Sequence, residues 1–86
     1  MYRIDRGRVI WEALDGETLV VDTESGFYFS LDEVGSVVWS LLATGYGEDE
    51  IIAAVRTDYE VEEEVARRDV RMLIEELRAE QLITPA

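Results

Sequence analysis

The side chains of this sequence that could do chemistry are almost all carboxylates and guanidiniums. The 86 residues include 20 Asp or Glu, eight Arg, and no His, Cys or Lys. The chain therefore has no imidazole base, no thiolate nucleophile and no Schiff-base lysine. Its densest acidic runs, 48–50 and 62–64, lack the alternating ligands and central Gly of a calcium loop. We expect a protein that is not an enzyme and that holds no metal or cofactor.

The charge balance narrows the class of partner. A net charge of −12 opposes binding to nucleic acid, which needs a basic footprint over the phosphates, and opposes docking on an anionic membrane. No segment approaches the roughly 20 apolar residues that span a bilayer, and the polar N-terminus lacks the apolar region of a secretory signal. We expect a cytoplasmic protein of one domain, residues 1–86, that stands alone from Met1.

The first third of the chain has the pattern of strands. β-Branched and aromatic residues fill three segments, 8–14, 17–22 and 27–31. Asp15-Gly16 between the first two is a strong hairpin signal, and a second turn covers 23–26. The pattern predicts a three-stranded antiparallel meander.

After residue 31 the apolar spacing becomes helical. It predicts one helix to about Thr44, a second over 48–57 and a third over 62–81, after which Leu82 and Ile83 fold back. The first helix could begin with a Ser30–Glu33 capping box or with Asp32 as the cap. In the third helix, the core stripe is expected to contain the residues Ala66, Val70, Leu73 and Leu77. The element order predicts an α+β, winged-helix-like domain.

The third strand is the first candidate binding element. As the edge of a meander it exposes unpaired backbone groups, and it carries no charge or Pro to blunt that edge. It could accept an extended peptide by strand addition or pair with its own copy in a homodimer. The alternative is that Phe27 and Phe29 are simply core and a helix covers the edge.

An arginine stripe on the third helix is the second candidate. Arg67, Arg71 and Arg78 fall on one side of the core stripe together with Ile74, where they could hold an acidic, partly apolar peptide. The alternative is a solvated face with local ion pairs at the spacings Glu63–Arg67, Arg71–Glu75 and Glu75–Arg78. Asp69 borders the core stripe and is interpreted as structural, paired with Arg68 or with loop backbone.

Three segments of the sequence form an ordered set of motifs. They are Asp22-x-x-Ser25-Gly26-x-Tyr28-Phe29-x-Leu31-Asp32-Glu33-Val34-Gly35, then Val38-Trp39-x-Leu41-Leu42, and, in the closing helix, Asp69-Val70-x-x-Leu73-x-x-x-Leu77 with Leu82. In this order the segments resemble the PqqD-like family of peptide-recognition domains. One departure is Asp32 where the family commonly has Asn, and both residues cap helices well.

The resemblance implies a RiPP recognition element that binds the leader segment of a ribosomal precursor peptide as an added strand, between the third strand and the third helix. A stand-alone chain is most similar to the leader-binding proteins of lasso-peptide biosynthesis, which would take a leader Tyr and a nearby Pro and deliver the precursor to a leader peptidase or other modifying enzyme. The alternatives are the precursor chaperone of pyrroloquinoline quinone biosynthesis and a winged-helix DNA-binding regulator. Val65 and Met72 remain an alternative wall of the groove. The expected peptide-binding residues are Gly26, Phe27, Tyr28, Phe29, Ser30, Leu31, Arg67, Val70, Arg71, Ile74 and Arg78.

Overall fold

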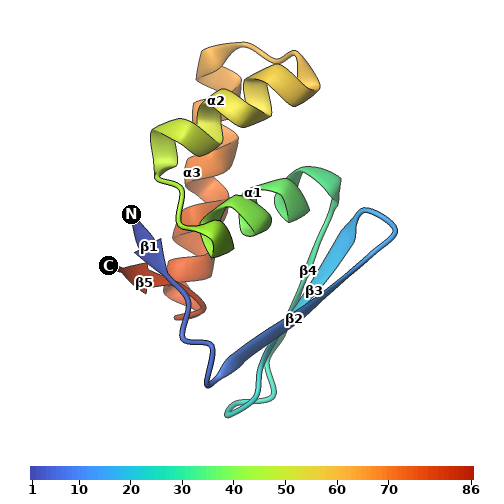
Figure 1. Cartoon of the computed structure of the whole chain (residues 1–86), viewed down its shortest axis with the longest axis vertical. Helices are drawn as coiled ribbons and strands as arrows, with labels where there is room; N and C mark the ends of the chain where they lie inside the picture. Colours follow the sequence, from blue (N-terminus) through green and yellow to red (C-terminus); the bar gives the residue numbers. More distant parts are fainter.

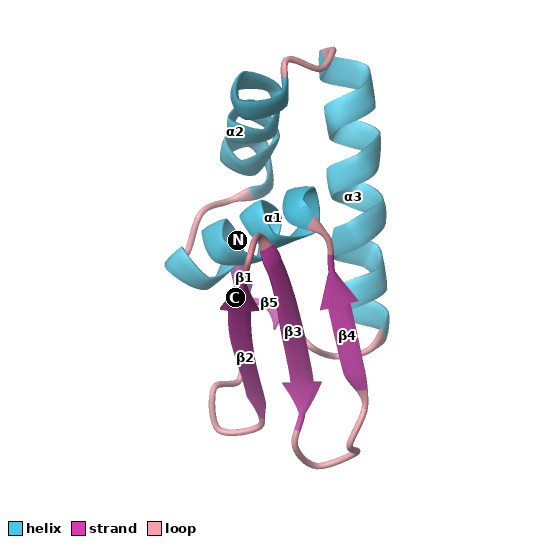
Figure 2. Ribbon diagram, turned by 90° about the vertical axis from the view of Figure 1, so that its right-hand side faces the viewer, coloured by secondary structure: helices cyan, strands magenta, loops and turns pink.

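Three strands form an antiparallel meander in which β3 lies between β2 and β4. The strands are β2 (Val9–Leu14), β3 (Glu17–Asp22) and β4 (Tyr28–Leu31) in the computed structural model, which describes residues 1–86. Asp15 and Gly16 both have positive φ, 51° and 81°, as a two-residue hairpin turn requires. The predicted meander and its turns are confirmed (Figures 1 and 2).

Three helices follow the sheet, as the spacing predicted. They are α1 (Glu33–Thr44), α2 (Glu48–Tyr59) and α3 (Glu63–Ala79). The Asp32 carboxylate caps α1 by accepting a 2.8 Å hydrogen bond from the Gly35 backbone N–H. The capping box at Ser30 is wrong, because Ser30 continues β4 opposite Leu19. None of the helices is both long and apolar enough to cross a membrane.

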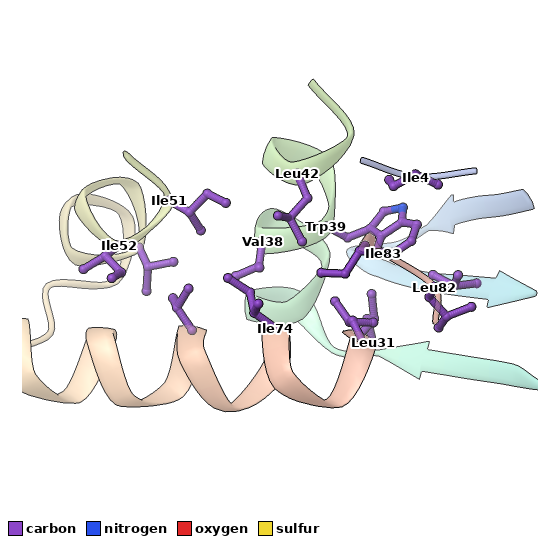
Figure 3. Close-up of a cluster of buried hydrophobic side chains, with 14 of the residues drawn as sticks. Ile4, Leu31, Val38, Trp39, Leu42, Ile51, Ile52, Ile74, Leu82 and Ile83 are labelled. Atoms are coloured by element: carbon purple, nitrogen blue, oxygen red, sulfur yellow. The ribbon is translucent and has the colours of Figure 1, made fainter. Parts of the chain in front are cut away.

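The core lies between one face of the sheet and the three helices (Figure 3). Trp39 of α1 is fully buried and meets Trp11 of β2 edge to face, with ring centroids 5.4 Å apart. The buried stripe of α3 is rotated from the predicted one, since Ile74 takes the place of Leu73, which is only partly buried. The buried residues of α3 are Ala66, Val70, Ile74 and Leu77.

The two ends of the chain pair with each other, which the sequence analysis missed. The strand β1 (Tyr2–Arg3) is antiparallel to β5 (Thr84–Pro85), with Tyr2 opposite Pro85. Two-residue strands are too short to show an alternating pattern, so there was no signal to read. Leu82 and Ile83 do fold back, as expected, and are fully buried beneath this pair.

Candidate functional site: a groove between an edge strand and a helix

One edge of the sheet, along β4, is open. The Asp22 backbone N–H donates to the Phe27 carbonyl, so this pair is hydrogen-bonded. Hydrogen-bonded pairs alternate along an antiparallel ladder, which makes Phe29 and Leu31 the next residues bonded to β3. The backbone groups of Tyr28 and Ser30 therefore point away from β3. They offer a free row of donors and acceptors at the open edge.

A groove runs beside this edge, between β4 and α3. Figure 2 shows these two elements next to each other. Its volume is about 470 Å³. The helix contributes the side chains that lie on one flank of its buried stripe, and the start of α1 closes one end. The residues that line the groove are Phe29, Ser30, Leu31, Asp32, Val34, Gly35, Asp69, Met72, Leu73 and Glu76.

The chemistry of the groove is apolar with an acidic border. Half of its lining residues are hydrophobic, among them Phe29 from the strand and Met72 from the helix. The charged lining residues are all carboxylates: Asp32, Asp69 and Glu76. An apolar surface beside a free ladder suits alternate apolar side chains of an extended chain, and the border favours a chain without negative charge there.

Asp69 differs from its predicted role. It was expected to be half-buried and structural, but its side chain is 55% exposed and lines the groove. Its neighbour Arg68 lies 3.5 Å away, the partner that the sequence analysis named. An exposed ion pair of this kind contributes little to folding. Asp69 is therefore available to the groove.

The strand half of the predicted site is brought together. Phe29, Ser30 and Leu31 line the groove, and Tyr28 adds its backbone to the free edge. Phe27 precedes β4 and stacks near Phe29, with ring centroids 6.3 Å apart. Gly26 lies in the turn with φ 77°, which lets the chain reverse into β4. These residues form one continuous stretch along the open edge.

The helix half of the predicted site lies elsewhere. Val70 and Ile74 are only 1% and 2% exposed and belong to the core, so they do not line the groove. The flank of α3 that lines the groove is the alternative one named from the sequence, the flank that contains Met72. Val65, the other residue named on that flank, is not among the lining residues. Periodicity located the stripe to within one residue, but an error of one residue turns a helix by 100°.

The arginine stripe faces away from the groove. Arg67 lies 3.5 Å from Asp49, and Arg71 lies 3.1 Å from Glu48, both acids of the α2 N-terminus. Of the expected local pairs, only Glu63–Arg67 forms, at 3.6 Å. The Arg78 guanidinium lies 5.9 Å from the centroid of the Tyr2 ring in β1. The expectation that these arginines form the groove rim therefore disagrees with the structure, in which they attach α3 to α2 and β1.

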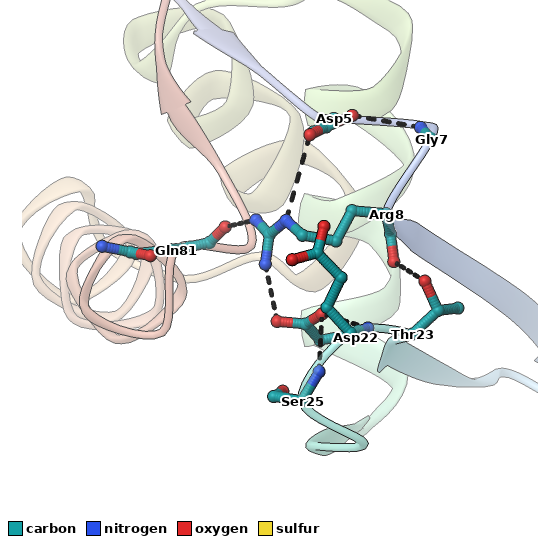
Figure 4. Close-up of polar contacts among 8 residues, drawn as sticks. Asp5, Gly7, Arg8, Asp22, Thr23, Ser25 and Gln81 are labelled. Carbon is teal, nitrogen blue, oxygen red and sulfur yellow. Dashed lines mark hydrogen bonds and ion pairs between the residues drawn. The ribbon is translucent and has the colours of Figure 1, made fainter.

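A partly buried polar cluster connects Arg8, the β3–β4 turn and the segment after α3, and sequence reasoning missed it (Figure 4). Arg8 forms a 2.6 Å ion pair with Asp22 at the end of β3 and also donates to the Gln81 carbonyl after α3. The contact spans 73 residues of sequence, so no local pattern could indicate it. It links the β3–β4 turn, which leads into β4, to the segment that follows α3.

The same cluster perturbs the ionisation of Asp22. Burial of its carboxyl raises the pKa, but hydrogen bonds from the backbone of Glu24 and Ser25 outweigh this effect. The nearby Arg8 guanidinium acts in the same direction, so the pKa of Asp22 lies below its ordinary value. The ionised form of Asp22 is the form that the fold stabilises.

Comparison with known proteins agrees with this fold. The family model described as coenzyme PQQ synthesis protein D (PqqD) matches residues 17–83. This is most of the chain and includes both walls of the groove. The chain belongs to the PqqD family, as the resemblance in its sequence implied.

Two solved structures share the whole architecture. One is described as TbiB1 in complex with the TbiA(beta) leader peptide; it is 32% identical, has a TM-score of 0.90, and the match covers 98% of this chain and 96% of that one. The other is described as lasso peptide synthetase B1 complexed with the leader peptide, at 24% identity, TM-score 0.86 and 98% coverage of both chains. The second supports the fold alone. A comparison with curated proteins gave no significant match.

Proposed function

We propose that this protein is a non-catalytic adaptor that binds the leader segment of a ribosomal precursor peptide by strand addition on β4 and delivers it to a modifying enzyme. The observation that carries the proposal is the free backbone edge of Tyr28 and Ser30 directly beside an apolar groove. The TbiB1 relative, whose description names a bound leader peptide, supports the same role.

The groove defines the chemistry of the leader segment. Backbone pairing with β4 is nearly independent of sequence, so selection comes from the side chains that enter the groove. These side chains are apolar, and they contact Phe29, Met72 and Leu73. The border of Asp32, Asp69 and Glu76 favours neutral or basic residues on either side. A leader with neutral or basic residues at these positions replaces the acidic peptide that the arginine stripe suggested.

The expected binding free energy of the leader fits an adaptor that carries a precursor peptide. An edge of two residues offers only a few hydrogen bonds, each with a net contribution of about 1 kcal/mol. Ordering a disordered leader costs several kcal/mol, so the affinity stays moderate unless the enzyme adds contacts. Holding the leader nevertheless raises the effective concentration of the precursor at an enzyme bound to the same adaptor.

The resemblance of the sequence to the leader-binding proteins of lasso-peptide biosynthesis favours a leader peptidase as the enzyme that receives the precursor, and the TbiB1 structure with its leader peptide supports leader binding. The name of the family model instead favours a partner in pyrroloquinoline quinone synthesis. Binding of the purified adaptor to the leader peptidase or to the radical enzyme encoded nearest its gene distinguishes the two.

The strand-addition step is tested by Ser30→Pro. Proline removes the Ser30 N–H, which faces the open edge, and leaves the hydrogen bonds between β4 and β3 intact. We expect fluorescence anisotropy with a labelled synthetic leader from the neighbouring precursor gene to show at least tenfold weaker binding. The matched control Ser30→Ala keeps the N–H and should bind as the wild type does.

A second probe covers the case in which Ser30→Pro fails to fold. Leader peptides N-methylated at single positions should lose binding at every second residue of the bound segment, because only alternate amides face β4. Unchanged binding by a folded Ser30→Pro variant, or tolerance of every N-methyl group, would show that the leader does not bind as a strand.

A further inference from the structure

The strand β2 forms a second open edge of the sheet, on the side of β3 opposite to β4 (Figure 2). The Thr23 backbone N–H donates to the Arg8 carbonyl at 2.9 Å, so every second residue from Arg8 onward is bonded to β3. The backbone groups of Trp11 and Ala13 therefore point away from β3, and no other strand pairs with them. This free row has the same length as the one on β4.

A cleft of about 390 Å³ lies beside this edge, between the β2–β3 hairpin and α1. Its α1 wall carries two hydroxyls with a proton to donate. The Ser36 hydroxyl accepts a 2.8 Å hydrogen bond from the buried Thr18 and keeps its own proton free. The Ser40 hydroxyl, one turn further along α1, also lines the cleft.

Arg6 adds a fixed cation to the cleft. Its guanidinium donates to the Ala43 carbonyl at 2.7 Å and lies 5.0 Å from the centroid of the Trp11 ring. The one carboxylate among the lining residues is Glu17, and alternation from the buried Thr18 places its side chain on the other face of the sheet. The cleft along β2 therefore suits an acceptor such as a carboxylate, whereas carboxylates border the groove along β4.

A chain that is already tethered suits this edge better than a free partner does. Two residues of edge offer only a few backbone hydrogen bonds, which is little against the entropy lost when a free peptide is ordered. A precursor held on β4 is instead present at β2 at the effective concentration that its own linker sets. Neighbouring strands lie about 4.8 Å apart, so strands added at both edges would be about 19 Å from each other. About ten residues of extended chain exceed that distance.

We propose that β2 is a second strand-addition site, which binds another stretch of the same precursor and places a carboxylate side chain of that stretch beside Arg6. The inference rests on the proposed function, because the groove along β4 supplies the tether. A second copy of this chain suits the β2 edge poorly, since each copy carries a net charge of −12.

The test compares two labelled probes by fluorescence anisotropy. One is the full-length precursor encoded nearest the gene, and the other is a short peptide with only the stretch that binds β4. Wild-type protein should bind the full-length precursor at least fivefold more tightly. Ala13→Pro removes the free N–H, keeps the bonds between β2 and β3, and should abolish this gain while the affinity for the short peptide changes less than twofold. The matched control Ala13→Ser keeps the N–H and should retain the gain.

A separate arm tests the chemistry of the cleft. Arg6→Gln should reduce the gain at least twofold, and so should a precursor in which Asp and Glu outside the short peptide are changed to Asn and Gln. Arg3→Gln removes a cation that does not line the cleft and should leave the gain intact. A gain that survives both changes would overturn the assignment of a carboxylate to the cleft.

Hydrogen exchange of the wild type covers the case in which Ala13→Pro fails to fold. The amides of Trp11 and Ala13 should exchange more slowly with the full-length precursor, but not with the short peptide. Protection that appears without peptide and grows with protein concentration would show that a second copy occupies β2, and the inference would be wrong.

The outcomes separate the two proposals. If both probes bind the wild type equally, or if a folded Ala13→Pro variant keeps the gain, the second site is wrong and the adaptor function stands. If neither probe binds the wild type, the proposed function fails, and the inference that rests on it fails as well.

Discussion

The two flanks of α3 have opposite chemistry and opposite roles. One flank presents Met72, Asp69 and Glu76 to the groove, and no cation lines that groove. The other presents Arg67 and Arg71, which pair with Asp49 and Glu48 of α2. Arg67 and Arg71 attach α3 to α2, whereas Asp69 and Glu76 border the groove, where Asp69 is paired with its exposed neighbour Arg68.

Charge on a helix surface therefore identifies a partner only once the neighbouring elements are known. In isolation the arginine stripe resembles a site for an acidic peptide. Next to the acidic N-terminus of α2 it becomes an attachment between two helices. The less conspicuous flank, with one methionine and two carboxylates, is the one left open to a ligand.

The largest expected effect concerns the buried stripe that separates the flanks. Ile74→Ala should lower the free energy of unfolding by about 2–5 kcal/mol, because it leaves a cavity among α1, α2 and α3. Leader affinity of the folded protein should not change. Urea denaturation measures the first quantity and anisotropy the second. A stable Ile74→Ala variant with weak leader binding would place Ile74 in the groove after all.

The next prediction compares the two flanks of α3 by substituting one residue on each. Met72→Asp adds a fourth carboxylate to the groove and removes apolar contact, so leader affinity should fall at least tenfold. Met72 is exposed, and the free energy of unfolding should change by less than about 1 kcal/mol.

The control for this variant is Arg71→Gln on the opposite flank. It removes the pair with Glu48, which contributes about 0.2–1 kcal/mol, and should leave leader affinity within twofold. Equal losses of leader binding for the two variants would contradict the assignment of the flanks.

The smallest effect concerns the Arg8–Asp22 cluster, which connects the β3–β4 turn to the segment after α3. Because the folded-state pKa of Asp22 is lowered, its contribution to stability is present above its unfolded pKa of about 4 and is lost as pH falls through the folded value. Wild-type protein should lose more stability than Asp22→Asn between pH 5 and pH 2.5 in urea titrations. Glu24→Gln, an exposed carboxylate in the same turn, should follow the wild type.

The sequence predicted the parts of the fold that depend on local patterns. The hairpin at Asp15-Gly16 and the open edge at Tyr28 follow from alternation and turn chemistry, and both are found. The flank of α3 that forms the groove could not be predicted, because Leu73 and Ile74 are both apolar and only the packing of α3 against the rest of the core decides which one is buried.

Contacts distant in sequence were also beyond prediction. Arg8 and Gln81 meet only because β2 and the end of α3 arrive at the same corner. The short β1–β5 pair has the same origin, in backbone hydrogen bonds between distant segments without a side-chain pattern.

That terminal pair has a consequence for how the domain can be joined to others. Since the first and last residues are held side by side, with the Ala86 N–H donating to the Met1 carbonyl at 3.1 Å, both ends leave the molecule at one point. A host protein could carry this domain inside one of its surface loops with two short linkers and little added chain entropy. The architecture is thus already suited to modular insertion, with the open edge of β4 left unobstructed.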